Sequence, residues 1–435
     1  MNDPTRSHLL MVPYYFPPLG MGGVQRPLKF ARYLPEFGWD VSVLTPSVGA
    51  YHAIDDSLLA GLPESVKIVR VRTWDPARWI STLRSWTTTS DEAGEWRRNL
   101  KSVQEWLRWP DDKRAFVGPA VRQAMRIAAQ HPVDLVWTTS PPPSTHLVGM
   151  RLRRRLGVRW VADFRDPWFA RFDDWGPTRW HARYARQLCS QIVRTADGVI
   201  AASQAIGSSL ARRTGGGDSP TVICNGFDES DFAGITPAMN ANAAFTIVLY
   251  GTFGINPDPK PLFALLREWK KHRPGAALRV RHVGLSLGRD LQTLAAQHGL
   301  AGEFESLGYQ THRQSIEILL SADLAALPLS PQPGFHDILP GRIFELLRSR
   351  RPILLLTSAE SEATRLLQPL EGCWTVAHED FGAGIAALDG IARLPREAPA
   401  RSVSSIRQFE RREQTRVLAG VLDRLKTAGP PVGAR

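Results

Sequence analysis

The chain has 435 residues, of which 43% are hydrophobic and 22% are charged, and these proportions exclude a globally disordered protein. A formal net charge of +12 favours acidic partners, such as nucleic acid, anionic lipid headgroups or phosphorylated substrates. Three cysteines that are far apart and odd in number predict neither a disulfide framework nor a metal cluster. Because the chain is too long for one ordinary core, we expect two domains.

No apolar run reaches the length of about 18 residues that a membrane span requires. The first residues also lack the basic and then apolar order of a secretory signal. We therefore expect a cytoplasmic protein, either free in the cytoplasm or held peripherally at the inner face of the membrane.

The first 45 residues predict a unit of strand, glycine loop, helix and strand. An apolar strand at 9–12 leads into a loop that ends at Gly22 and Gly23, and an amphipathic helix at 25–37 precedes a strand at 41–45. This order is typical of a doubly wound α/β fold. The loop lacks the three spaced glycines of a dinucleotide fingerprint, which argues against NAD binding.

Tryptophan and arginine gather between residues 74 and 115, where regular periodicity fades. This composition suits a membrane interface or a sugar-binding groove, so we expect an insertion that contacts the acceptor or an anionic membrane. The alternative is that these rings fill the core of a helical hairpin. A run of arginines at 151–155 predicts a solvated helix face, with docking on phospholipid as its alternative.

Two predicted strands, at 134–139 and 159–162, end in polar loops. Open parallel sheets bind ligands at the carboxyl ends of their strands, so we expect both loops to border one site. In the second loop, Asp163 and Asp166 either contact an acceptor hydroxyl or fix Arg165 and cap the next helix. In the first loop, His146 is either a ligand or a packed core residue.

A polar linker at 236–243 predicts the domain boundary. We expect a first domain at 1–236, a second at 244–405 and a helical segment at 406–435 that packs back on the first. The second domain begins with a strand at 245–250, which is followed by Gly251, and Lys260 precedes its first helix.

Two carboxylates, Asp337 and Glu345, flank a predicted helix start. Pro340 and Gly341 stand at its first turn, where proline is pre-set for the helix and glycine allows a ligand to approach the backbone. The first amides of a helix have no intrahelical partner and carry the positive end of its dipole, so this end suits a diphosphate. The carboxylates are spaced so that one can hold a ribose and the other a sugar hydroxyl.

These motifs, in this order, resemble those of retaining GT-B glycosyltransferases of family 4, of the bacterial glycosyl transferase group 1 type. That family has two glutamates separated by seven residues, and Asp337 differs from the first of them by one methylene. Arg165 takes the place of a histidine found in better known relatives. The resemblance covers almost the whole chain and implies an α/β protein of two facing Rossmann-like doubly wound domains, with a C-terminal helix that crosses back to the first.

The resemblance also implies a role for each motif. Glu345 would hold the ribose and Asp337 the donor sugar hydroxyls. The other donor-binding residues would be Gly22, Gly23, Gly251, Lys260, Pro340, Gly341 and Arg342. The acceptor-binding residues would be Gln25, Arg26 and His146. The catalytic residues would be Asp163, Arg165, Asp166 and Asp337.

The implied reaction moves a sugar from a nucleoside-diphosphate sugar, with UDP or GDP as the favoured nucleotide, to a hydroxyl acceptor. We expect a lipid-linked saccharide or a polysaccharide precursor as the acceptor, retention of the anomeric configuration, and no metal or other cofactor. One alternative is a natural-product scaffold as the acceptor, and another is a nucleotide-sugar epimerase of the same fold. A non-enzymatic nucleic-acid-binding protein is suggested by charge alone, and no recognisable nucleic-acid module supports it.

Overall fold

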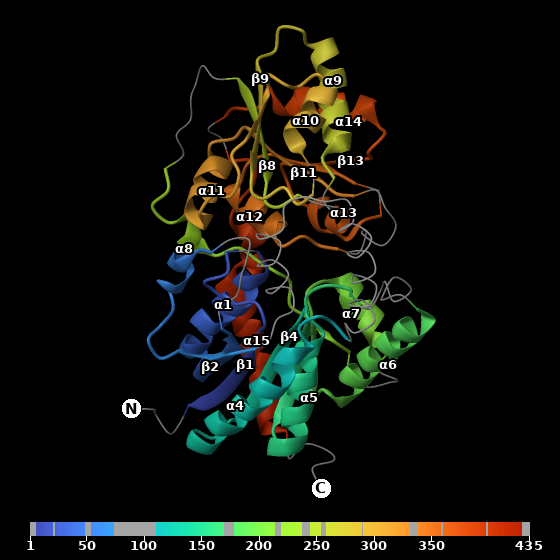
Figure 1. The fold of residues 1–435 in the computed structure, drawn as a ribbon. Helices are drawn as coiled ribbons and strands as arrows, with labels where there is room; N and C mark the ends of the chain where they lie inside the picture. Colours follow the sequence, from blue (N-terminus) through green and yellow to red (C-terminus); the bar gives the residue numbers. More distant parts are fainter. Residues whose placement is uncertain are drawn as a thin grey trace, which may run out of the picture. The chain divides into compact units, whose positions relative to one another are not determined.

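The computed structural model describes residues 6–20, 22–47, 54–73, 110–168, 178–213, 219–236, 244–253, 258–288, 290–330, 338–357, 360–396 and 399–428. The chain forms two compact units, drawn in Figure 1. The first comprises Met1–Cys224 together with Gln414–Arg435, and the second comprises Asn225–Glu413. Most of the predicted insertion at 74–115 lies outside the described residues.

The first unit contains a seven-stranded parallel sheet with the order β3-β2-β1-β4-β5-β6-β7. Its strands are β1 (Ser7–Val12), β2 (Trp39–Pro46), β3 (Lys67–Val71), β4 (Leu135–Ser140), β5 (Arg159–Phe164), β6 (Gly198–Ala201) and β7 (Thr221–Val222). The strand order changes direction between β1 and β4. Ligands of doubly wound sheets bind at such a switch point, outside the carboxyl ends of the strands.

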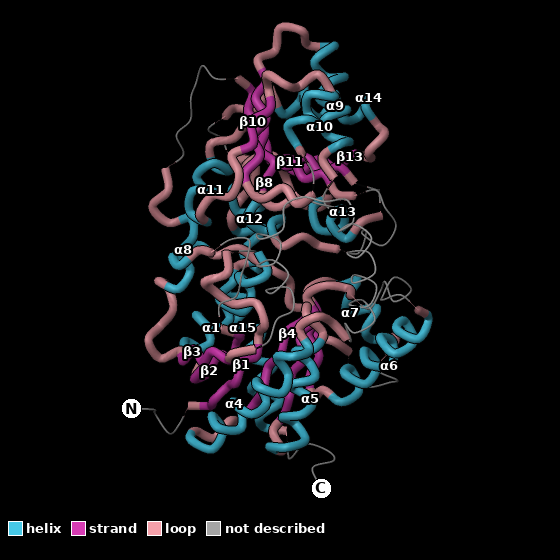
Figure 2. Tube along the Cα trace, viewed as in Figure 1, coloured by secondary structure: helices cyan, strands magenta, loops and turns pink. Residues whose placement is uncertain are grey.

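Helices cover both faces of this sheet, as Figure 2 shows. The α-helices are α1 (Gln25–Tyr33), α4 (Val117–Gln130), α5 (Ser144–Leu156), α6 (Arg179–Thr195), α7 (Gln204–Ala211) and α15 (Arg411–Thr427), and the 3-10 helices are η1 (Gly22–Val24), η2 (Leu34–Phe37), η3 (Asp56–Leu59) and η4 (Arg114–Phe116). Successive residues of β1 point to opposite faces. Leu9 therefore packs in one core with α1 and α15, while Leu10 packs in the other with α4, α5 and α6.

The last helix, α15, completes one of these two cores. Leu418 and Leu422 are fully buried among side chains of β1, β2 and α1. Trp39 Nε1 donates a hydrogen bond of 3.0 Å to Asp423 Oδ1. The prediction that the final helix crosses back to the N-terminal domain is confirmed, although the helix begins at Arg411 rather than at 406.

We expect Leu418→Ala to lower the free energy of unfolding by about 2–5 kcal/mol, because it removes a fully buried side chain and leaves a cavity. Urea denaturation followed by intrinsic fluorescence measures this loss. The neighbouring Val417 is 41% exposed, so Val417→Ala should change the same quantity by less than about 0.5 kcal/mol. Equal losses in the two variants would contradict the packing described for α15.

The second unit contains a six-stranded parallel sheet with the order β10-β9-β8-β11-β12-β13. Its strands are β8 (Phe245–Tyr250), β9 (Leu278–Val283), β10 (Phe304–Ser306), β11 (Leu324–Pro328), β12 (Ile353–Leu356) and β13 (Cys373–Val376). Its helices are α8 (Glu229–Phe232), α9 (Lys260–His272), α10 (Leu291–Gln297), α11 (His312–Leu320), α12 (Arg342–Ser349), α13 (Glu362–Leu367), α14 (Phe381–Ile391) and the 3-10 helix η6 (Ser404–Phe409). The switch point here lies between β8 and β11.

The first unit ends after Cys224, earlier than the polar linker at 236–243 that the sequence favoured. The turn after Cys224 bonds to residues of the second unit, since Phe227 N donates to the carbonyl of Phe409 (3.1 Å) and Arg411 N donates to the carbonyl of Phe227 (2.7 Å). A Cβ on Gly226 would lie 2.0 Å from the Phe409 carbonyl oxygen, so only glycine fits this approach.

Candidate functional site

The carboxyl ends of β1, β4 and β5 carry the loops that the sequence singled out. Gly22 and Gly23 follow β1 and lead through η1 into α1. The prolines after Ser140 follow β4, and the loop that contains Arg165 follows β5. Because the sheet is parallel, these loops lie at the same edge, next to the switch point between β1 and β4.

Arg165 ties the three loops together. Its Nε donates to the carbonyl of Ser140 (3.3 Å) and its Nη2 to that of Pro141 (2.7 Å). Its Nη1 donates to the carbonyl of Gly23. Burial lowers the pKa of this guanidinium, and the negative charges of the neighbouring aspartates oppose that shift. Through these contacts with backbone carbonyls, Arg165 positions the three loops.

Asp163 forms a fully buried ion pair with Arg26. Arg26 Nε and Nη2 donate to the two carboxylate oxygens at 3.0 and 2.7 Å, and Thr139 Oγ1 donates to Oδ2 at 2.7 Å. Arg26 Nη1 also donates to the carbonyls of Ile223 (2.8 Å) and Cys224 (2.9 Å). Arg26 is 1% exposed and Asp163 is 0% exposed. This burial gives both side chains a structural role in the first unit.

His146 is also fully buried in the first unit. Its Nδ1 lies 2.8 Å from Thr138 Oγ1, and its ring packs on that of Phe164 with 4.8 Å between centroids. Burial lowers the pKa of His146 to about 3, and the positive charge of Arg165 adds to the shift. The ring is therefore neutral at neutral pH and belongs to the core. The sequence allowed this interpretation as the alternative to a role in binding the acceptor.

Three of the residues predicted in the first unit are accessible. Asp166 and Gly23 are exposed, and Gln25 is half-buried at the start of α1. Surrounding protein reduces the hydration of the Asp166 carboxyl and raises its pKa, while Arg165 opposes that shift. These three positions can therefore contact a ligand at the carboxyl edge of the sheet.

The loop after β4 depends on a residue that the sequence analysis missed, Asp111. Its carboxylate accepts hydrogen bonds from the backbone N (2.7 Å) and the hydroxyl (2.8 Å) of Ser144, the first residue of α5. Burial raises the pKa of Asp111, and the bonds from Ser144 oppose that shift. Asp111 and Ser144 are 33 positions apart, so no local pattern in the sequence indicates this contact.

In the second unit, α12 begins directly after Pro340 and Gly341, where the sequence predicted a helix start. Gly341 is the N-cap residue and is exposed. The amide of Ile343 donates to the Pro340 carbonyl (3.1 Å). Asp337 lies outside the residues that the structure describes. The amide of Phe344 likewise donates to the Gly341 carbonyl (3.4 Å), so the exposed Gly341 stands at the positive end of the dipole of α12.

Arg342 points from α12 to the carboxyl end of β8. Its Nη1 donates to the Tyr250 carbonyl and its Nη2 to the Thr252 carbonyl, each at 2.6 Å. Its Cζ lies 5.5 Å from the centroid of the Phe253 ring. Burial lowers the pKa of Arg342 to about 10, so the side chain is still a cation at neutral pH. It contributes positive charge near the start of α12 while it fixes the loop after β8.

Gly251 lies under this arginine. Its φ is +96°, which strains any residue with a side chain, and a Cβ there would lie 2.9 Å from Cζ of Arg342, so the guanidinium would have to shift. Lys260 is the first residue of α9 and is exposed, and its amide donates to Asp258 Oδ1 (3.2 Å). Both residues stay at the carboxyl side of β8, where the prediction placed them.

Glu345 lies one turn into α12, in a polar cluster that the sequence analysis missed. It accepts a hydrogen bond from the side chain of Tyr250, and its Oε1 lies 3.9 Å from Nε2 of His312. That ring nitrogen lies 3.1 Å from Asp231 Oδ2. Burial and the negative charge of Glu345 raise the pKa of Tyr250 well above its ordinary value, so the phenol keeps its proton and donates it.

The Glu345 carboxylate is thus held in place on one side and accessible on the other. Its side chain is 18% exposed, whereas Tyr250 is only 6% exposed. A positioned carboxylate with free acceptor capacity suits a pair of neighbouring hydroxyls, such as those of a ribose. Over the described part of the chain, no group of three or more His, Cys, Asp or Glu side chains is placed to hold a metal ion.

Comparison with known proteins finds one family model that matches part of the chain and solved structures that share its fold. Residues 21–231 match the model of Glycosyltransferase Family 4. Sucrose-phosphate synthase from Thermosynechococcus elongatus is 15% identical, with a TM-score of 0.68 over 98% of this chain and 100% of that one. HepE from Anabaena, in complex with UDP-glucose, is 14% identical, with a TM-score of 0.57 over 96% and 97%.

A putative UDP-N-acetylglucosamine 2-epimerase from Listeria monocytogenes is 10% identical, with a TM-score of 0.54 over 98% of both chains. At these identities the likeness shows the fold alone. The search of curated proteins gave no match.

Among the described residues, no helix is both long enough and apolar enough to cross a bilayer.

Proposed function

Because residues 21–231 belong to glycosyltransferase family 4 and the chain has the GT-B fold, we propose that the protein is a retaining glycosyltransferase that uses a nucleoside-diphosphate sugar. The observation that carries this proposal is the Glu345 carboxylate, fixed by Tyr250 one turn inside α12 and still accessible. This carboxylate can accept hydrogen bonds from the ribose hydroxyls of a nucleoside. It lies beside a helix start that suits the diphosphate.

We assign the donor to the second unit. Glu345 holds the ribose, and the diphosphate lies at the first turn of α12, at Pro340 and Gly341. Arg342 adds positive charge there, and we also assign Lys260, at the start of α9, to the phosphates. Asp337 is assigned to the donor sugar by the resemblance alone. UDP and GDP are the favoured nucleotides, and the UDP-glucose bound to HepE supports the first of them.

The chemistry that these residues perform is mainly positioning and charge stabilisation. A nucleoside diphosphate leaves as a stable anion, so the reaction needs amides and cations where negative charge develops. The first turn of α12 and Arg342, whose pKa is about 10, supply these groups in the second unit. In the first unit, Asp166 is the accessible carboxylate of the predicted catalytic set, and we assign it and Gln25 to the acceptor hydroxyl.

We propose a lipid-linked saccharide or a polysaccharide precursor as the acceptor, with a natural-product scaffold as the alternative. A nucleotide-sugar epimerase is the second candidate function, and the likeness to the Listeria monocytogenes protein favours it. The two differ in one respect that is easily measured. An epimerase converts the sugar nucleotide without any acceptor, whereas a transferase consumes it only when an acceptor hydroxyl is supplied.

A thermal-shift screen against UDP-, GDP-, dTDP- and ADP-sugars tests the donor assignment. We expect one nucleotide series to raise the unfolding temperature, since a ligand at 100 times its Kd stabilises the native state by about 2.7 kcal/mol. The free nucleoside diphosphate of that series should also stabilise the protein, because the assigned contacts are with the ribose and the diphosphate. A protein that no member of the panel stabilises would contradict the proposal.

A further inference from the structure

Three neighbouring helices of the first unit, α4, α5 and α6, contain no aspartate or glutamate. All three pack against the same face of the sheet (Figure 1). Their arginines are Arg122 and Arg126 in α4, Arg151, Arg153, Arg154 and Arg155 in α5, and Arg179, Arg183, Arg186 and Arg194 in α6. Apart from Arg153, all of these are exposed. We call this surface the basic face.

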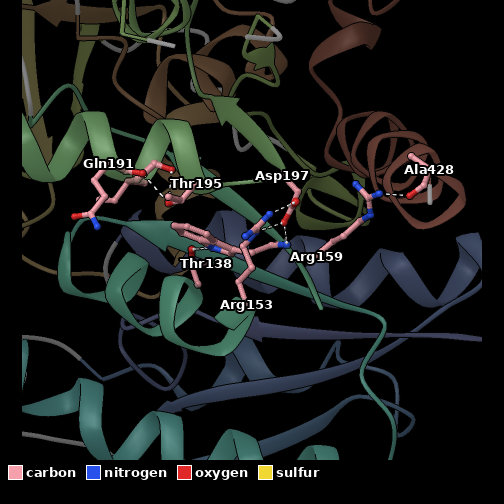
Figure 3. Close-up of polar contacts among 9 residues, drawn as sticks. Thr138, Arg153, Arg159, Gln191, Thr195, Asp197 and Ala428 are labelled. Atoms are coloured by element: carbon pink, nitrogen blue, oxygen red, sulfur yellow. Dashed lines mark hydrogen bonds and ion pairs between the residues drawn. The ribbon is translucent and has the colours of Figure 1, made fainter. Parts of the chain in front are cut away.

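Arg153 differs from the other arginines because it forms an ion pair with Asp197. Figure 3 shows Asp197, just after α6, accepting hydrogen bonds from Nε (2.8 Å) and Nη2 (3.0 Å) of Arg153. The same carboxylate also accepts the amide of Trp160 (2.9 Å). Asp197 is therefore occupied in joining α5 to β5, and its charge is matched by Arg153. The exposed arginines lie on helices that contain no acidic residue of their own.

The helix α6 adds aromatic rings to this charge. Trp180 is 79% exposed and Tyr184 is 52% exposed. Residues four apart lie on the same side of a helix, so the two rings are neighbours. The other side of α6 is buried through Ala185, Leu188 and Ile192, among others. The helix therefore has a core-facing side and a solvent side that combines aromatic rings with arginines.

We propose that the basic face docks on an anionic lipid bilayer, with Trp180 and Tyr184 at the level of the headgroups. Tryptophan and tyrosine favour this interface because each has an apolar body and a polar group. Arginines beside them are attracted by the surface potential of anionic lipid. Helices that lie in the membrane plane combine these two features.

A bilayer fits this surface better than a nucleic acid does. Proteins that bind single strands place their aromatic rings in a basic groove that follows the backbone. Here the most exposed ring, Trp180, stands on the convex side of a helix, where a flat, deformable surface can meet it. None of the residues assigned to donor or acceptor belongs to the basic face, so this inference does not depend on the proposed activity.

Vesicle co-sedimentation of the full chain tests the proposal. We expect binding to vesicles of phosphatidylcholine with phosphatidylglycerol, and much weaker binding to phosphatidylcholine alone. Replacing both rings, as Trp180→Ser with Tyr184→Ser, should weaken binding to the mixed vesicles by about tenfold or more. Reversing two charges, as Arg179→Glu with Arg183→Glu, should weaken it similarly, and added salt should weaken wild-type binding.

Matched controls come from the second unit. Arg279 and Arg407 are exposed there, so Arg279→Glu with Arg407→Glu makes the same change of charge elsewhere and should leave binding to vesicles unchanged. Leu394 is 41% exposed, and Leu394→Ser is the control for the loss of an exposed apolar side chain. The unfolding temperature of every variant should match that of the wild type, because all of the replaced side chains are exposed.

Two results would overturn the proposal. One is undiminished binding of the Trp180 and Tyr184 double variant to mixed vesicles. The other is a wild-type protein that does not bind the vesicles but slows the migration of a single-stranded oligonucleotide in a gel. In that case the Arg179 and Arg183 variant would no longer slow the oligonucleotide. A response to nucleotide sugars that is unchanged in both variants would show that any loss of vesicle binding is separate from the donor site.

Discussion

Glu345→Gln should weaken the binding of the nucleotide sugar by about tenfold to a hundredfold. A hydrogen bond to a charged group contributes about 1.5–3 kcal/mol, and glutamine keeps the shape of the side chain while losing its charge. Tyr250 can still donate to the amide oxygen of glutamine, so the fold should be retained. Isothermal titration calorimetry with the nucleotide that stabilises the wild type measures the effect.

Two further variants separate charge from position at this site. Tyr250→Phe leaves the carboxylate but removes the hydroxyl that holds it, so we expect a smaller loss of affinity than in Glu345→Gln. Glu317→Gln, on α11, makes the same chemical change at a side chain that is 47% exposed and should bind as the wild type does. Wild-type affinity in Glu345→Gln would refute the donor assignment.

Asp163→Asn should lower the free energy of unfolding by about 3–5 kcal/mol, because it leaves the buried guanidinium of Arg26 without its counter-charge. Arg26→Met should also destabilise the protein, since it removes the same pair and the donor to the carbonyls of Ile223 and Cys224. Urea denaturation of each variant measures the loss.

The double variant identifies the cause of that loss. If the ion pair is responsible, Arg26→Met with Asp163→Asn should cost less than the two single variants together, by a coupling of about 0.5–3 kcal/mol. Glu317→Ala, at an exposed ion pair, should change stability by less than about 1 kcal/mol. If the Asp163→Asn protein were as stable as the wild type but inactive, the result would instead indicate a catalytic role for Asp163.

The sequence was sufficient to predict the fold because the relevant patterns are local. The apolar residues of β1 and the amphipathic helix that follows predicted a doubly wound unit, and the structure has one in each half of the chain. The start of α12 was predicted from Pro340 and Gly341, since the conformational preferences of these two residues act within one turn.

The roles of the polar residues could not be predicted in the same way. Arg26 and Asp163 are 137 positions apart, and no local pattern indicates that they meet in a buried pair. Nor does any local pattern indicate that both terminal nitrogens of Arg342 bond carbonyls at the end of β8. Whether an arginine meets a ligand or a carbonyl depends on packing between distant segments, which a single sequence does not record.

The role of Tyr250 could not be predicted from the sequence either. It closes a predicted strand at the carboxyl end, where functional side chains gather in parallel sheets, but an aromatic residue in a strand is most often a core residue. Its hydrogen bond to Glu345 depends on the packing of α12 against β8, which the sequence of the strand does not indicate.

The position of Leu418 and Leu422 bears on how the protein is made. A ribosome that has delivered residues 1–224 has not yet synthesised the helix that seals one side of that unit. Domains usually mature one after another as the nascent chain emerges. Here the first must wait for the whole of the second, and the apolar surface that α15 covers beside α1 stays open until then. Residues 1–224 expressed alone would keep that surface open to chaperones or to aggregation.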